Sequence, residues 1–341
     1  MSNEQNSLLV SSSPHLHSRD SVPKIMLTVV LALMPAMAAS VYFFGWNAIR
    51  LTLVCVAACV AFEFTARRLM GRNAGVDDFS AVVTGLLLAF NLPPSLPSWM
   101  AVVGCFAAIV ITKQLYGGIG YNIFNPALIG RAVLLIAFPV AMTTWLAPGQ
   151  GFFPGADAVT TATPLGAWKT VCRQGPLDPQ FFQNLPIMNL LTGNRPGCIG
   201  ETPALALLLG GGILLWRRCI YWYTPLAYIA TVSVFAGILH FADPASNLPV
   251  PYHLLTGGLI IGAFFMATDM VTTPVTRSGM LIFGMGCGIL TMLIRKWGGY
   301  PEGVSFAILI MNALTPLIDR ATRPNVFGRR KTLPPDKEHQ P

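Results

Sequence analysis

A short polar strip at residues 157–164 carries the side chains best suited to a covalent modification, in the order Asp-Ala-Val-Thr-Thr-Ala-Thr-Pro. Its threonine hydroxyls are flanked by small residues, and Pro164 biases Thr163 away from the helical conformation toward an extended, reachable backbone. These features are typical of a substrate for a modifying enzyme. On chemistry alone, a polar turn that carries no attached group is the alternative.

Three carboxylates at the ends of apolar runs are the candidates for catalytic or ion-handling chemistry. Glu201 stands just before the run that begins at 203, Asp269 ends the run 253–268, and Glu302 opens the last run. Charged side chains at membrane depth are costly, so each one there needs a partner or a function. The alternative for each is to cap a helix or to interact with its dipole.

Three further polar residues interrupt apolar segments. Asn125 and the following proline break the start of one segment, Arg131 follows about one turn later, and Asn312 lies within the last segment. A proline in a helix frees backbone carbonyls, which a bound group or a partner helix must satisfy. We expect these residues to gather near two short, interrupted spans at 79–92 and 253–268, where a binding site built on broken helices would form.

The seven cysteines lie mostly inside apolar runs and include no C-x-x-C pair, so the sequence predicts neither a zinc site nor an iron–sulfur cluster. Small packing residues are their simplest role. Cys172 and Cys198 are the two that fall in the long polar stretch between the apolar halves. We hypothesise a disulfide between them, with two free thiols as the alternative.

The composition places the chain in a membrane. Of its 341 residues 53% are hydrophobic and 11% charged, whereas soluble domains are roughly one quarter charged. The formal net charge of +8 then reflects topology rather than a nucleic-acid partner.

The apolar runs predict an all-α polytopic membrane protein with about ten transmembrane helices. The expected spans are 24–44, 47–66, 79–92, 98–113, 123–145, 203–216, 221–240, 253–268, 279–294 and 303–320. We divide the chain into a polar N-terminal segment 1–23, a five-helix half 24–145, a loop 146–202, a five-helix half 203–320 and a basic tail 321–341. Because five is odd, two such halves would be inverted relative to one another. Thr84-Gly85 and Thr256-Gly257 are a weak sequence similarity between the two halves.

The distribution of basic residues predicts the orientation. If the N-terminus is cytoplasmic, 15 lysines and arginines fall on the inner side and six on the outer side. This asymmetry favours both termini inside and the loop 146–202 outside. Arg295 and Lys296 are the exception, because this map puts them on the outer side.

Several motifs together resemble one known family. Residues 157–163 resemble the D-x-x-[ST]-x-A-T signal at which a flavin transferase esterifies FMN to the final threonine, with Thr161 at a place where the signal more often has Gly or Ser. The segments Asn125-Pro126-Ala127, Gly200-Glu201-Thr202, Ala267-Thr268-Asp269 and 302–312 look like further landmarks, in the expected order. The family is the D subunit of the Rnf ion-translocating electron-transport complex, related to the B subunit of the sodium-translocating NADH:quinone reductase. The resemblance covers about residues 20–325.

This resemblance implies an electron relay rather than an enzyme that is active alone. Thr163 would carry FMN as a phosphodiester, Asp157 could position the metal-bound flavin donor during attachment, and Thr160, Thr161 and Ala162 complete the signal. The family also implies a second, non-covalent flavin, riboflavin or FMN, for which the candidates are Asn125, Arg131 and Asn312.

The cellular setting follows from the same resemblance. The chain would act with other membrane and peripheral subunits in a bacterial inner membrane, after maturation by the flavin transferase. The complex would couple NADH- or ferredoxin-type electron transfer to ion translocation, with the FMN loop in the periplasm. Asp269, Glu302 and Glu201 are the catalytic candidates, and no metal ligand is predicted. The alternatives are a flavin-free secondary transporter built from inverted repeats and a purely structural membrane anchor.

Overall fold

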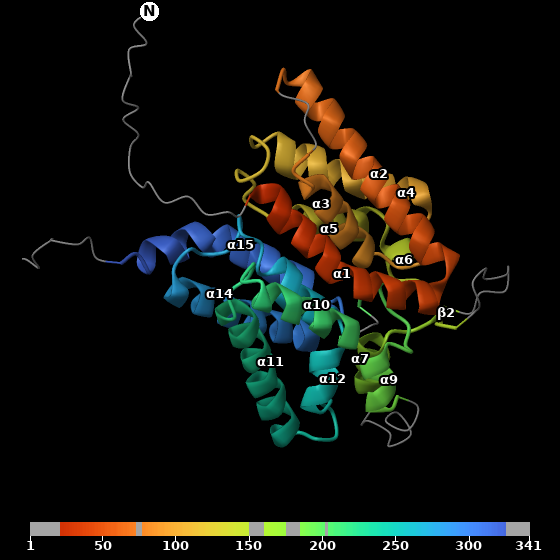
Figure 1. Ribbon diagram of the computed structural model, residues 1–341. Coiled ribbons are helices and arrows are strands. Elements are labelled where there is room, and N and C mark those ends of the chain that lie inside the picture. The colour runs from red at the N-terminus through yellow and green to blue at the C-terminus, as the bar shows by residue number, and fades with distance from the viewer. Residues whose placement is uncertain (1–20, 73–76, 150–159, 175–184, 202–203, 325–341) are drawn as a thin grey trace, which may run out of the picture.

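The computed structural model describes residues 21–72, 77–149, 160–174, 185–201 and 204–324. Within these ranges the protein is helical apart from one two-stranded antiparallel sheet. Long helices cross one another in a bundle, and shorter helices lie at one end of it (Figure 1).

The first half of the chain forms five helical segments. They are α1 (Val22–Phe44), α2 (Trp46–Leu69), α3 (Ser80–Phe90), α4 (Ser98–Phe106) with its π-helical continuation η1 (Ala107–Gln114), and α5 (Pro126–Ala137). Asn125 caps α5, because its side-chain oxygen accepts hydrogen bonds from Ala127 N and Leu128 N. Pro126 suits the first helical position, because an N–H group there would have no partner within the helix and proline has none.

The connecting region contains small elements. They are α6 (Pro139–Met142), β1 (Trp145–Leu146), β2 (Thr160–Thr161), α7 (Pro164–Gln174) and α9 (Ile187–Thr192). The strands pair Trp145 with Thr161 and Leu146 with Thr160. Both α7 and α9 lie beside α12 at one end of the bundle (Figure 1).

The second half contains three long helices and one broken segment. It contains α10 (Ala204–Trp216), α11 (Tyr223–Ala242), α12 (Val250–Leu255), α13 (Leu259–Ile261) with π-helix η2 (Gly262–Met266), α14 (Arg277–Trp297) and α15 (Val304–Ala321). The expected interruption of 253–268 is confirmed, because the helix stops at Leu255 and resumes after Gly258. The interruption expected in 79–92 is wrong, since α3 runs unbroken from Ser80 to Phe90. Gly257 and Gly258 adopt positive φ angles of 68° and 66°, which glycine tolerates without a side-chain clash.

In the part of the chain that the structure describes, five helices are long and apolar enough to cross a membrane by length and composition: α1, α2, α11, α14 and α15. Four shorter apolar helices occupy Ser80–Phe90, Ser98–Gln114, Pro126–Ala137 and Ala204–Trp216. The predicted continuous span 123–145 is wrong, since α5 ends at Ala137 and Pro139 begins a separate short helix. A proline cannot donate the hydrogen bond that would continue α5. The class of polytopic membrane protein therefore stands, with fewer full-length spans than expected.

The two halves of the chain contact each other through their first and their last helices. The first helices of each half, α1 and α10, pack together, and so do the last, α5 and α15. The approach of α10 to α1 depends on Gly210, because a Cβ there would lie 2.1 Å from the Ala32 carbonyl oxygen. A single large hydrophobic core runs through both halves.

Candidate functional site

Arg131 of α5 is the centre of a buried charge cluster. Its Nη2 donates to Glu302 Oε2, and its Nη1 donates to Asn91 Oδ1 at 3.0 Å and to Cys198 Sγ at 3.5 Å. Asn91 follows α3 and Glu302 precedes α15, so the guanidinium joins residues from both halves of the chain. Arg131 and Glu302 lie 171 positions apart in the chain, so only the fold brings them together.

Glu201 is bound by the broken helix of the second half. Its Oε1 accepts a hydrogen bond from Gly257 N, and it lies 3.9 Å from Arg195 Nη2. The same Arg195 nitrogen donates to the Glu201 backbone carbonyl at 2.9 Å. Gly257 is thus part of the site: it has a positive φ angle, and its backbone N–H binds the buried carboxylate of Glu201.

Arg295 satisfies the open carbonyl end of α12. Its Nη1 donates to His253 O at 2.6 Å, and its Nη2 donates to Thr256 O at 2.8 Å. The last carbonyls of a helix have no partner within the helix, and a cation there also interacts favourably with the helix dipole. Arg295 was an exception to the charge asymmetry of the sequence. The structure explains its position, because Arg295 is fully buried and its guanidinium binds the end of the interrupted helix. Its neighbour Lys296 donates to Asn247 Oδ1 at 2.6 Å.

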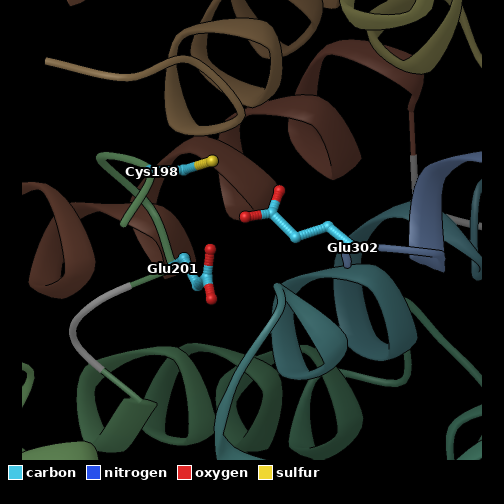
Figure 2. Close-up of side chains that lie close together, drawn as sticks. All are labelled: Cys198, Glu201 and Glu302. Atoms are coloured by element: carbon cyan, nitrogen blue, oxygen red, sulfur yellow. The ribbon is translucent and has the colours of Figure 1, made fainter. Parts of the chain in front are cut away.

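Figure 2 shows Cys198, Glu201 and Glu302 pointing toward a common space, with one potential ligand atom of each within 4.8 Å of the others. This residue set could in principle hold a metal ion. However, the guanidinium groups of Arg131 and Arg195 already pair with the two carboxylates. With Arg295, the cluster holds three cations against two carboxylates, which disfavours an added metal cation. The arrangement is better suited to holding or exchanging a proton.

The electrostatics of Glu302 fit that role. Burial raises the pKa of its carboxyl to about 7, and the charge of Glu201 adds to this while Arg131 opposes it. Its second oxygen, Oε1, has no hydrogen-bond partner among the residues that the structure describes. A carboxyl that titrates near neutrality is the kind of group that general acid–base chemistry requires.

The hypothesised disulfide is not formed in the structure. Cys198 is a free, buried thiol that donates to the Asn91 carbonyl at 3.4 Å. Burial raises the pKa of this thiol well above its usual value. The side chain of Cys172 lies outside the described residues. Cys198 therefore packs into the charge cluster, where Arg131 donates to its sulfur.

Asp269 lies apart from this cluster. It follows η2, and its carboxylate accepts hydrogen bonds from Val271 N at 3.5 Å and Thr272 Oγ1 at 3.3 Å. Burial raises the pKa of Asp269, and no described side chain forms an ion pair with it. It lines a hollow of about 100 Å³ together with Lys113 and Asn125.

The residues predicted for a second flavin are only partly brought together. Asn125 lines that hollow and donates to Met266 O at 3.3 Å. When the Asn312 amide is oriented so that both its oxygen and its nitrogen have partners, its oxygen accepts a hydrogen bond from Asn125 N at 3.1 Å, so these two residues are in contact. Arg131 and Asn312 are not among the residues that line the hollow. Ser80 and Asn122 add polar groups to its lining.

Thr163 is the N-cap of α7. Its Oγ1 accepts a hydrogen bond from Gly166 N at 3.1 Å, and its carbonyl accepts one from Ala167 N at 2.8 Å. The sequence predicted a reachable residue, whereas Thr163 is 3% exposed; Thr161 and Ala162 beside it are exposed. Thr160 lies in β2, and Asp157 falls outside the described residues. The burial of Thr163 therefore differs from the reachable hydroxyl that the sequence predicted.

Sequence reasoning missed a second buried charge network, centred on Glu63 of α2. Its carboxylate accepts from Lys113 Nζ at 2.7 Å and from Arg67 Nη2 at 2.6 Å. Lys113 also donates to Ser80 Oγ at 2.6 Å, and Arg67 pairs with Asp78 at 2.8 Å. The available signal was a single glutamate inside the apolar run 47–66. Partial burial alone would raise the pKa of Asp78, but hydrogen bonds from Ser80 and Arg67 outweigh this and lower it.

The fold and this site define a polytopic, all-helical membrane protein with buried ion-pair networks between broken helices. Residues 9–328 match the family described as NQR2, RnfD, RnfE. The chain belongs to this family, which confirms the resemblance seen in its motifs.

The curated relatives are similar over nearly their whole lengths. The chain is 45% identical to the D subunit of the proton-translocating ferredoxin:NAD(+) oxidoreductase complex of Clostridium ljungdahlii, over 96% of this chain and 98% of the relative. It is also 45% identical to the D subunit of the Na(+)-translocating ferredoxin:NAD(+) oxidoreductase complex of Acetobacterium woodii, with the same coverage. The D subunit of the ion-translocating oxidoreductase complex of Stutzerimonas stutzeri is 45% identical over 91% of this chain and 93% of the relative.

Proposed function

We propose that this protein is the D subunit of an ion-translocating ferredoxin:NAD+ oxidoreductase complex and relays electrons through FMN carried covalently on Thr163. Family membership over residues 9–328 is the observation that carries the proposal. The strip at residues 157–163 supports the attachment site. The flavin supplies the redox chemistry when bound, through a ring system that accepts and releases electrons.

The surroundings of Thr163 fit a phosphate ester. Its oxygen stands at the start of α7, an 11-residue helix, and faces the Gly166 N–H. A helix N-terminus favours negative charge, so a phosphodiester at Thr163 would be stabilised by N–H groups of the first turn, such as that of Gly166, and by the helix dipole. Because the hydroxyl is buried as a cap, the first turn of α7 must open before a transferase can reach it. Exposed Thr161 and Ala162 offer the transferase a starting point.

The buried cluster of Arg131, Glu201 and Glu302 is the proposed site where electron flow meets proton or ion movement. It joins the loop before α10, the start of α15 and the broken segment between α12 and α13. Broken helices at the junction of two repeats are where coupling sites occur in ion-coupled membrane proteins. The packing of α1 on α10 and of α5 on α15 supports inverted halves at 24–145 and 203–320.

We infer the orientation from charge. Both termini would be cytoplasmic and the loop 146–202 periplasmic, because basic residues concentrate on the inner side. Thr163 would then face the periplasm, in a bacterial inner membrane that also holds the partner subunits.

A second, non-covalent flavin would have its ring near Asn125. The polar groups of Asn122, Ser80 and Thr84 fit the hydrogen-bonding edge of a flavin. A hollow of about 100 Å³ is smaller than the fused ring system, so apolar lining residues such as Phe264 would have to move. Flavin released without covalent cleavage, measured in wild type and in Asn125→Ala, tests this site.

Flavin fluorescence in a denaturing gel is the decisive experiment for the main proposal. The wild-type protein, produced with a flavin transferase, should give a fluorescent band, and mass spectrometry should place FMN on Thr163. Thr163→Ala should be dark. Thr163→Ser retains a hydroxyl that can cap α7, so it controls for folding and tests attachment to a serine. Thr160→Ala and Thr161→Ala should remain fluorescent. A dark wild-type band, or a bright Thr163→Ala band, would contradict the proposal.

A flavin-free secondary transporter is the second candidate, favoured by the buried carboxylates beside broken helices. It predicts substrate-dependent transport by the isolated chain without flavin absorbance. Colour and transport measured on the same preparation separate the two functions.

A further inference from the structure

A basic hollow lies where the start of α1 meets the end of α10. It has a volume of about 570 Å³ and is lined by Lys24, Arg217 and Arg218. No carboxylate occurs among the lining residues that the structure describes. Three cations around one opening attract an anion, and arginine is especially suited to phosphate because its guanidinium donates two parallel hydrogen bonds.

The backbone holds Arg218 in an unusual conformation. Its φ angle is 54°, and among the described residues only Phe79 shares a positive φ without being glycine. A side chain other than glycine in this region is strained. Helix α10 ends at Trp216, and Arg218 lies in the tight turn that follows. A glycine would fit at this position without strain.

The apolar surface beside the hollow indicates what kind of phosphate it binds. Leu27 and Leu31 line the hollow on α1 and are 43% and 58% exposed. Trp216 borders it and is 83% exposed. Lys24 stands within the first turn of a 23-residue apolar helix, so the basic groups lie at the level where that helix leaves the membrane. Tryptophan and basic residues are typical of this level.

We propose that this hollow is a binding site for one anionic diacyl phospholipid. The phosphate would contact Arg217 and Arg218, and an acyl chain would lie along α1 over Leu27 and Leu31. A soluble anion would make no use of the exposed leucines. The site shares Ile25, Cys219 and Met270 with the hollow that contains Asn125, so a lipid here also covers that side of the inner hollow.

The test uses the intact complex, stripped of lipid in detergent and titrated with dioleoylphosphatidylglycerol or dioleoylphosphatidylcholine. Native mass spectrometry counts the lipids retained. Arg218→Gly is the informative variant, because it removes the cation and places glycine at a positive φ, so the turn remains favourable. We expect its affinity for phosphatidylglycerol to fall about fivefold, the usual effect of one basic side chain near an anionic bilayer surface. Arg218→Lys should retain most of the affinity.

Arg320→Gln is the matched control, since Arg320 is an exposed arginine outside the lining of the hollow. It should leave retention unchanged. Equal retention of both lipids by the wild type, or full retention of phosphatidylglycerol by Arg218→Gly, would overturn the proposal. The proposal would also be overturned if Arg218→Gly retained as much phosphatidylglycerol as wild type but lost non-covalent flavin, because the basic groups would then bind a flavin phosphate. Covalent flavin on Thr163 should be unaffected, so this test is independent of the proposed function.

Discussion

Replacing Arg295 by lysine tests the idea that one guanidinium holds the broken helix of the second half in place. Arg295 uses two nitrogens to reach the carbonyls of His253, Thr256 and Gly257, and the single lysine nitrogen cannot serve all three. A buried carbonyl left without a partner costs about 1–3 kcal/mol, and a lost hydrogen bond to a charged group about 1.5–3 kcal/mol. We therefore expect Arg295→Lys to destabilise the protein by about 3 kcal/mol.

Thermal unfolding in detergent measures this change. A dye that fluoresces on reaction with thiols reports unfolding, because Cys55, Cys105 and Cys287 are buried free thiols. At about 2 °C per kcal/mol for a large domain, the unfolding temperature of Arg295→Lys should fall by about 6 °C. Lys296→Gln is the matched control on the next position of α14. It removes the charged donor to Asn247 and should cost about 1.5 kcal/mol, the lower end for a hydrogen bond to a charged group, because Lys296 is only partly buried. An Arg295→Lys protein as stable as wild type, or no less stable than Lys296→Gln, would refute the capping role.

Four other predictions follow from the site and the topology. Because the folded-state pKa of Glu302 is raised to about 7, its contribution to stability is full below about pH 4.3 and is lost as the pH rises through about 7. The stability of wild type relative to Glu302→Gln should thus fall by up to about 3 kcal/mol over this range; a flat difference in unfolding free energy would contradict the raised pKa. Asp269→Asn should reduce electron flux or ion uptake in vesicles holding the whole complex by more than about tenfold; near wild-type rates would contradict a role for its charge and assign Asp269 to the local turn. Cys198 should be fully alkylated after denaturation without reductant, and a protected thiol would restore the disulfide hypothesis. A reporter fused after Gly328 should be cytoplasmic and one inserted near Gln174 exterior; the same side for both would refute the charge-based map.

The sequence by itself determined the class of protein and most helix positions. Apolar runs and their breakers depend on local composition, so α1, α2, α11, α14 and α15 begin and end within a few residues of their predicted bounds. The interruption near Gly257 and the cap at Asn125 were also predictable, because glycine pairs and Asn-Pro have local conformational preferences. The family likewise followed from short motifs.

Only the tertiary structure decided which charges meet. Arg131 and Glu302 are 171 positions apart in the chain, and Glu63 and Lys113 are 50 apart. Local patterns contain no information on such pairs, so the sequence names no partner for Glu302 and leaves Arg295 as an exception to the charge asymmetry. Thr163 shows the same limit, because its sequence predicts an extended backbone but its burial depends on the fold around α7. Helix formation is local, whereas the removal of charges from water is compensated by partners that only folding brings together.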